Sequence, residues 1–191
     1  KGLLLDGKCH NASINLQREF VYPTNIASLF DKYRVPKKAD YVSIDVDSSD
    51  IYILDALLSH GEDKHGRPTA TSYRPRLISI EYQPNFGYGS TLAFPDTTQV
   101  KLPSALQNWD GWTCYTAPSA KSIEAVARSH GYVPVGIATG MDLFFMPKEL
   151  AAANDVDIID LRKAEYPLPH SGKIWGQTKP MTPLQAFGLA L

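Results

Sequence analysis

The chain has 191 residues, of which 43% are hydrophobic and 20% charged, a composition typical of a globular domain rather than a disordered one. Its formal net charge of −1 argues against nucleic-acid binding through a basic surface, and no apolar run is long enough to predict a transmembrane segment. Two cysteines, Cys9 and Cys114, are too few for a disulfide scaffold and lack the spacing of a zinc site. We therefore expect free thiols in a reducing, intracellular compartment, either the cytoplasm or an organelle interior.

The N-terminal part of the sequence predicts two strands and a helix. A short apolar run at residues 2–5 ends at Asp6-Gly7, which is typical of a buried strand followed by a turn. The segment REFVY, residues 18–22, is a possible second strand. Thr24 is then expected to cap a helix. The apolar positions of this helix recur at i, i+3, i+4 and i+7, at Ile26, Leu29, Phe30 and Tyr33.

The middle of the sequence predicts a strand, a helix and another strand. DYVSIDV, residues 40–46, is short and rich in Val, Ile and Tyr, and therefore predicts a strand. Asp47 or Ser48 is expected to cap the following helix, which Gly61 can end in the left-handed conformation. The apolar stripe of this helix consists of Ile51, Leu54, Leu57 and Leu58. After a polar loop, RPRLISIEY, residues 74–82, predicts the next strand.

The C-terminal part predicts a long loop, a helix and a hairpin. Residues 83–117 form an irregular stretch with aromatic clusters, and loops of this length are usually functional or face a partner. Ser119 is expected to open a helix that Gly131 ends. Its inward-facing positions are Ala120, Ile123, Val126 and Ala127. Residues 132–138 and 143–147 predict two strands joined by the turn TGMD.

This order of elements predicts an α/β fold. Strands that alternate with helices form a mostly parallel sheet with helices on its faces, and the last two strands would close the sheet as an antiparallel hairpin. Residues 1–150 are therefore expected to form one α/β domain. Residues 151–191 are rich in Pro and Gly towards their end, show no sustained period and are expected to form an extended tail.

Four segments, in this order, carry a resemblance to a known family. They are DYVSIDVDSSDIYILDAL (40–57), YRPRLISIEYQPNFG (73–87), SAKSIEAVARSHGYVPVG (119–136) and GMDLFFM (140–146). Together they resemble the FkbM-type, S-adenosylmethionine-dependent methyltransferase-like proteins. In that family a strand ends in an I-D-[IV]-[DE]-x-x-[DE] block, and a later strand ends in I-E-Y-[NQ]-x-N.

The resemblance implies a Rossmann-like methyltransferase fold, of which this sequence holds the second part. The first strand and the Gly-rich turn of that fold are expected before Gly2, and they are missing from the sequence as given. In the family, this turn lets the backbone approach the methionine end of the cofactor. The chain is therefore expected to carry half of a site for S-adenosylmethionine.

Acidic residues at strand ends are candidate site residues, because ligands of parallel α/β sheets bind beyond the C-terminal ends of the strands. The resemblance implies that Asp6 accepts hydrogen bonds from the ribose hydroxyls of S-adenosylmethionine; the alternative is a turn-forming Asp before Gly7. Asp47 and Asp50 have a structural explanation at the start of a helix, where negative charge is favoured. Asp45 has none, and we place it in the cleft as a cofactor-binding and catalytic candidate.

Glu81 ends the neighbouring strand and is the second catalytic candidate. Asp45 and Glu81 could hold a divalent cation with Asn85 as a neutral oxygen donor, as in metal-assisted O-methyltransferases. The alternative is a metal-free cleft in which Asp45 or Glu81 orients the substrate or acts as a general base. No histidine is assigned a catalytic role, but His60 and His130 are placed near helix C-termini, where positive charge is favourable.

Two functions remain open, and a nucleotide-sugar or dinucleotide binder on a similar sheet is a weaker third, because no G-x-G-x-x-G motif is present. The first is methyl transfer from S-adenosylmethionine to an oxygen or nitrogen of a small-molecule or glycan-like acceptor, which needs alignment and exclusion of water more than elaborate catalytic groups. The second is a non-catalytic, methyltransferase-like subunit of a larger protein assembly. The C-terminal tail favours the second, because Trp175 and Phe187 are expected to be exposed anchors for a partner protein.

Overall fold

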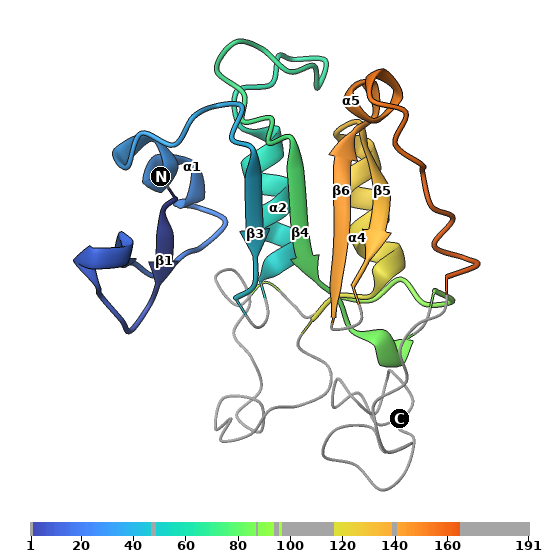
Figure 1. Cartoon of the computed structure of the whole chain (residues 1–191), viewed down its shortest axis with the longest axis horizontal. Coiled ribbons are helices and arrows are strands. Elements are labelled where there is room, and N and C mark those ends of the chain that lie inside the picture. The colour runs from blue at the N-terminus through green and yellow to red at the C-terminus, as the bar shows by residue number, and fades with distance from the viewer. Residues whose placement is uncertain are drawn as a thin grey trace, which may run out of the picture.

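The structure is a computed structural model that describes residues 2–46, 49–86, 88–93, 96, 117–138 and 141–164. This part of the chain is a mixed α/β fold with two small sheets (Figure 1). In chain order, the helices and strands are β1 (Leu4–Asp6), η1 (Ala12–Ile14), β2 (Leu16–Arg18), α1 (Ile26–Lys32), β3 (Tyr41–Ile44), α2 (Asp50–Ser59), β4 (Leu77–Glu81), η2 (Pro84–Phe86), α4 (Ala120–Ser129), β5 (Tyr132–Ile137), β6 (Asp142–Pro147) and α5 (Lys148–Ala153). None of these helices has the length and apolar character needed to cross a membrane.

The larger sheet has four strands in the order β3-β4-β6-β5. Strands β3 and β4 are parallel, whereas β6 is antiparallel to both of its neighbours, β4 and β5. The predicted hairpin of the last two strands is therefore confirmed, and it attaches to β4 through its second strand. The expected mostly parallel sheet is found only in part, because two of the three strand pairs in this sheet are antiparallel.

The smaller sheet consists of β1 and β2, which are parallel and pair Leu4 with Leu16. The expected strand at residues 18–22 was wrong in position, since β2 ends at Arg18. The residues that follow are used to begin α1: the Asn25 side chain donates to the carbonyl of Phe20 at 2.8 Å and accepts from the backbone N–H of Tyr22 at 2.7 Å. Asn25, not Thr24, is accordingly the N-cap of this helix.

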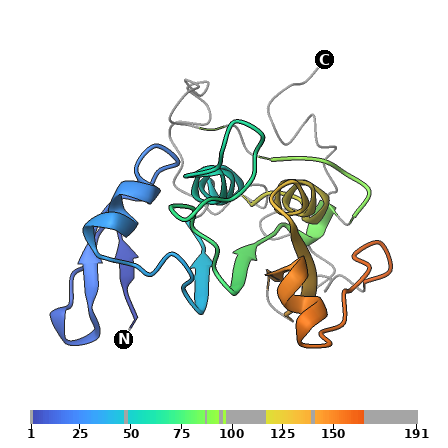
Figure 2. The same cartoon turned by 90° about the horizontal axis from the view of Figure 1, so that it is seen from above.

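Helices α2 and α4 lie side by side on one face of the four-stranded sheet (Figure 2). The hydrophobic core lies between these two helices and the sheet. Its most deeply buried members include Ile53, Leu54, Leu57 and Leu58 of α2, Ala120, Ile123 and Ala127 of α4, and Ile78, Ile80, Leu143 and Phe145 of the strands. The helical and strand periodicities read from the sequence therefore identify the core-facing sides correctly.

The ends of these two helices follow the predicted signals with one exception. Ser119 caps α4 and accepts a hydrogen bond from the backbone N–H of Ser122. Gly61 and Gly131 follow α2 and α4 with φ of 77°, the left-handed conformation that favours glycine. The exception is the start of α2, where the N-cap is Ser49; the expected caps, residues 47 and 48, lie outside the described residues.

Helix α5 continues directly from β6 and crosses the expected domain boundary after residue 150. Ala151 is fully buried, and Leu161, further along the chain, belongs to the hydrophobic core. Ala151 and Leu161, both beyond the expected boundary, therefore pack with the α/β domain, whereas most residues between them are exposed. Residues 165–191, including the expected partner anchors Trp175 and Phe187, lie outside the described residues.

Candidate functional site

Three carboxylates follow one another along the edge of the four-stranded sheet. Ile44 of β3 pairs with Ile80 of β4, so the next residues, Asp45 and Glu81, are neighbours across the parallel pair. Glu81 in turn pairs with Asp142, the first residue of β6. Side chains in register on adjacent strands point to the same face of a sheet. We call Asp45, Glu81 and Asp142 the acidic row.

A row of hydroxyl groups lies on the same face, one step further into the sheet. The Tyr41 hydroxyl lies 2.7 Å from Oγ of Ser79, which also donates to Oγ of Ser43 at 2.9 Å. Because side chains alternate along a strand, Ser43 shares its face with Asp45, and Ser79 shares its face with Glu81. The residues between them point into the core under α2 and α4. The acidic row therefore lies on the face opposite these two helices.

The turn from β3 to α2 holds Asp45 in place through a buried carboxylate. Asp50, in the first turn of α2, is fully buried, and its Oδ1 accepts a hydrogen bond of 2.8 Å from the backbone N–H of Val46. A carboxylate in the first turn of a helix is also favoured by the helix dipole. The structural role expected for Asp50 is thus observed, and it fixes the backbone directly after Asp45.

Tyr82 directly follows Glu81, the middle residue of the acidic row, in the sequence. Its side chain is fully buried, and its backbone N–H donates to the carbonyl of Met141 at 2.7 Å. Burial, and secondarily the negative charge of Asp142, raise the pKa of Tyr82 to about 12. Its hydroxyl therefore keeps its proton at neutral pH.

Asp6 belongs to a different part of the structure. It ends β1, in the two-stranded sheet, and its Oδ1 accepts hydrogen bonds from the backbone N–H groups of Cys9 and Lys8 at 2.6 and 2.7 Å. These two bonds, that of Cys9 first, lower the pKa of the Asp6 carboxyl. The structure thus joins Asp45 and Glu81 by strand pairing, whereas Asp6 forms the turn that was the alternative to its ribose role.

The expected metal ligands are only partly described. Asp45 and Glu81 are adjacent, but the side chain of Asn85 lies outside the described part of the structure. Within that part, no three His, Cys, Asp or Glu side chains form a group that could hold a metal ion. The metal site expected from the sequence therefore stays a prediction, with Asp45 and Glu81 as its two described residues.

Asp142 is the member of the acidic row that the sequence reasoning missed. It lies at the start of the predicted hairpin strand, just after the turn TGMD, and was not considered as a site residue. Only the antiparallel pairing of β6 with β4 places it opposite Glu81. The motif GMDLFFM was a usable signal, because an acid at the start of an antiparallel strand meets the C-terminal end of its neighbour.

Comparison with known proteins gives no assignment. The chain matches no protein-family model, no curated protein and no solved structure. Its function is therefore inferred from the chemistry of the acidic row and from the sequence motifs.

Proposed function

We propose that the chain takes part in S-adenosylmethionine-dependent methyl transfer to an oxygen or nitrogen of a small-molecule or glycan-like acceptor. The observation that carries the proposal is the pair Asp45 and Glu81, at the ends of adjacent parallel strands. Ligands of α/β sheets bind at this end of the strands. The antiparallel hairpin that closes the sheet is further support. So is the motif resemblance to FkbM-type proteins, which implies a Rossmann-like fold.

For methyl transfer the protein has to align the methyl donor with the acceptor and provide a group that takes the acceptor's proton. When bound, S-adenosylmethionine would supply a methyl group on a positively charged sulfonium, with its sulfur as the leaving group that keeps the electron pair. Glu81 is proposed as the general base that takes the acceptor's proton. The negative charge of the acidic row also attracts a cationic ligand.

The residues present suit one part of the cofactor. The ribose of S-adenosylmethionine offers two vicinal hydroxyls as donors, and an ionised carboxylate is a pure acceptor with two oxygens. Asp45 is exposed at the edge of the sheet and can take this role. Asp6, which forms the turn after β1 in the separate two-stranded sheet, is not part of this proposed site.

Binding of S-adenosylhomocysteine, measured by isothermal titration calorimetry, tests the proposal. We expect Asp45→Asn to weaken binding by about ten- to a hundredfold, the cost of a lost charge-assisted hydrogen bond. Glu81→Gln should leave binding within about threefold, because its role concerns the acceptor. Asp40→Asn is the matched control: Asp40 is exposed, lies just before β3 at its opposite end and pairs with Arg76 at 3.2 Å.

The outcomes separate clearly. Wild-type binding that Asp45→Asn weakens and Asp40→Asn preserves supports the proposal. Equal affinities in all variants would remove Asp45 from the cofactor site. No binding to the wild-type chain, even after addition of the expected upstream strand and turn, would reject methyl transfer.

A divalent metal ion at Asp45 and Glu81, with Asn85 as third ligand, is a separate part of the proposal. Titration of the wild-type chain with Mg²⁺, Mn²⁺ and Ca²⁺ should give heats that Asp45→Asn abolishes. Equal and negligible heats in both proteins would reject the metal site and leave the metal-free mechanism in place.

The alternative is a non-catalytic, methyltransferase-like subunit that binds a partner protein. It is favoured by the exposed apolar side chains around the two-stranded sheet. These are Leu4, Ile14, Phe20 and Tyr22, which are 41–60% exposed. Exposed apolar groups that gather on one part of a surface are typical of interaction sites. A monomer that binds S-adenosylhomocysteine would argue against this alternative, whereas concentration-dependent self-association without ligand binding would favour it.

A further inference from the structure

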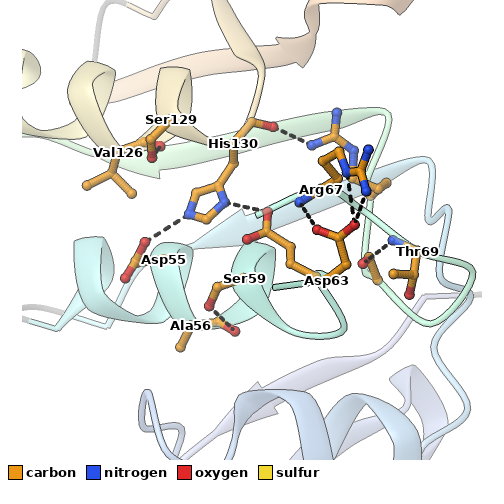
Figure 3. A network of polar contacts seen from close by, with 12 residues as sticks. Asp55, Ala56, Ser59, Asp63, Arg67, Thr69, Val126, Ser129 and His130 are labelled. Carbon is orange, nitrogen blue, oxygen red and sulfur yellow. Dashed lines mark hydrogen bonds and ion pairs between the residues drawn. The ribbon is translucent and has the colours of Figure 1, made fainter. Parts of the chain in front are cut away.

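His130 lies at the C-terminal end of α4, where it is the C-cap residue, and its ring faces α2 (Figure 3). Only 8% of its side chain is exposed. Two carboxylates meet this ring: Asp55 from α2 and Glu62 from the loop that follows α2. Each of the two contacts requires a proton on the ring nitrogen that faces the carboxylate. The protonation state of the ring therefore decides how many of the contacts are hydrogen bonds.

Both ring nitrogens are in hydrogen-bond contact with a carboxylate oxygen. His130 Nε2 lies 2.8 Å from Oδ1 of Asp55, and Nδ1 lies 2.9 Å from Oε1 of Glu62. An ionised carboxylate can only accept, and a neutral imidazole donates from one nitrogen only. The imidazolium form alone donates from both nitrogens, so it alone satisfies both contacts while the two carboxylates are ionised.

The neighbouring acidic side chain in the loop after α2 has an ion-pair partner other than His130. Among the described residues, His130 is the ion-pair partner of both Asp55 and Glu62. The next acidic side chain in the loop, Asp63, is paired with Arg67 at 2.8 Å. His130 is therefore the basic side chain that contacts both Asp55 and Glu62.

The charged side chains on the remaining elements around His130 also have partners of opposite charge. Arg74, in the segment before β4, donates to the backbone carbonyl of His130 and pairs with Glu149 of α5 at 3.2 Å. On α4 itself, Arg128 pairs with Glu124 at 2.7 Å. The carbonyl end of α4 adds a partial negative charge, which also favours a cationic ring.

The three residues join separate elements of the fold. Asp55 lies within α2, whose buried face anchors the helix to the core, whereas Glu62 lies in a loop that polar contacts hold. Among these contacts, the Thr69 hydroxyl donates to the carbonyl of Gly61 at 2.6 Å, and Glu62 forms an isolated bridge with Pro68. When the ring loses a proton, one ring nitrogen presents a lone pair to a carboxylate. The loop contact is the one expected to give way.

We propose that His130 is a pH-sensitive clamp, which in its imidazolium form holds α2, α4 and the loop at residues 61–69 together and on losing one proton releases that loop. A clamp that holds only in the imidazolium form stabilises the fold at low pH and loses that effect as pH rises. Imidazole side chains change charge between pH 5 and 8, which sets the range to examine. The clamp is independent of methyl transfer.

Urea unfolding and hydrogen–deuterium exchange of the whole chain between pH 6 and 8 test the clamp. The unfolding equilibrium constant should rise with pH, by at most about tenfold per pH unit for one proton. After correction for the intrinsic exchange rate, residues 61–69 should lose protection over the same range. His130→Gln should remove this pH dependence, whereas His65→Gln, at an exposed loop residue, should keep it.

Glu62→Gln provides a second, opposite test. A glutamine amide can donate to the bare nitrogen of a neutral ring while the other ring nitrogen donates to Asp55, so the neutral clamp is satisfied. This variant should match the wild type in stability at pH 8 and lose the pH dependence. The clamp is overturned if residues 61–69 keep equal protection from pH 6 to 8, or if Glu62→Gln has the wild-type pH dependence; these results count even if His130→Gln fails to fold.

Discussion

The four-stranded sheet buries the apolar side chains of its helix-covered face almost completely, whereas the two-stranded sheet leaves most of its own in contact with solvent. Ile78 and Ile80 of β4 are fully buried under α2 and α4. No residue of β1 or β2 is buried, and Leu4 in β1 is 49% exposed. Burial of apolar area is the main favourable term in folding, so the two sheets must contribute very unequally to stability.

Polar contacts replace apolar packing around the two-stranded sheet. Asp6 orders the turn after β1, and the side-chain amide of Asn15 donates to the carbonyl of Gly2 at 2.7 Å. Glu19 accepts from both Lys32 and Tyr33 of the α1 region. Exposed hydrogen bonds and ion pairs each contribute little net free energy. We therefore expect this region to open locally before the four-stranded sheet unfolds.

The largest effect should come from a core leucine. Leu57→Ala removes a fully buried side chain of α2 and should lower the free energy of unfolding by about 2–5 kcal/mol. Leu4→Ala is the matched control, since it makes the same change in the exposed strand β1 and should cost less than about 1 kcal/mol. Urea unfolding of both variants measures the difference. Equal losses would show that the two sheets form one cooperative core.

An intermediate effect is expected at Asp50, the buried carboxylate of the packed region. Asp50→Ala leaves the backbone N–H of Val46 without its acceptor and should lower the free energy of unfolding by about 1–3 kcal/mol. Asp50→Asn keeps an acceptor oxygen and should cost less. Asp157→Ala, at an exposed position, is the control. A wild-type unfolding midpoint for Asp50→Ala would mean that this contact does not hold the turn after Asp45.

The packed region is also the region that could be predicted from the sequence. Helices α2 and α4 and the final hairpin were predicted because one buried face gives each element a regular apolar period. The two-stranded sheet has no such period, and β2 was placed too late in the chain. The N-cap of α1 was missed because Asn25 is fixed by contacts to Phe20 and Tyr22, which a residue preference for Thr24 does not reveal.

The site residues that lie at the C-terminal ends of strands could be predicted from the sequence. The residue that joins them only through strand pairing could not. Asp45 and Glu81 were predicted as neighbours because both follow parallel strands. Asp142 joins them only through the antiparallel pairing of β6 with β4; the motif GMDLFFM indicates the strand but does not fix the register of that pairing. Asp6 was expected to share the site, but its strand pairs with β2 in a separate sheet.

The smallest effect, confined to the exposed region, is expected from the titration of Asp6. Backbone N–H groups of Cys9 and Lys8 lower the pKa of its carboxyl below the ordinary 3.8. A lowered folded-state pKa contributes stability that is present above the unfolded pKa and lost as pH falls through the folded pKa. The turn should therefore persist at pH 4 and open only below the ordinary aspartate range. Because Asp6 is exposed, the global unfolding midpoint should barely change.

The amide signals of Lys8 and Cys9, followed by NMR from pH 5 to pH 2, report on this turn directly. Both should shift with one common midpoint below 3.8, and Asp6→Asn should abolish that shift. A midpoint at or above the ordinary value would mean that the two N–H groups do not hold the ionised carboxylate. Both Asp6 and Asp50 accept hydrogen bonds from backbone N–H groups. Such a midpoint would mean that only the buried carboxylate, Asp50, forms a hydrogen bond that contributes to stability.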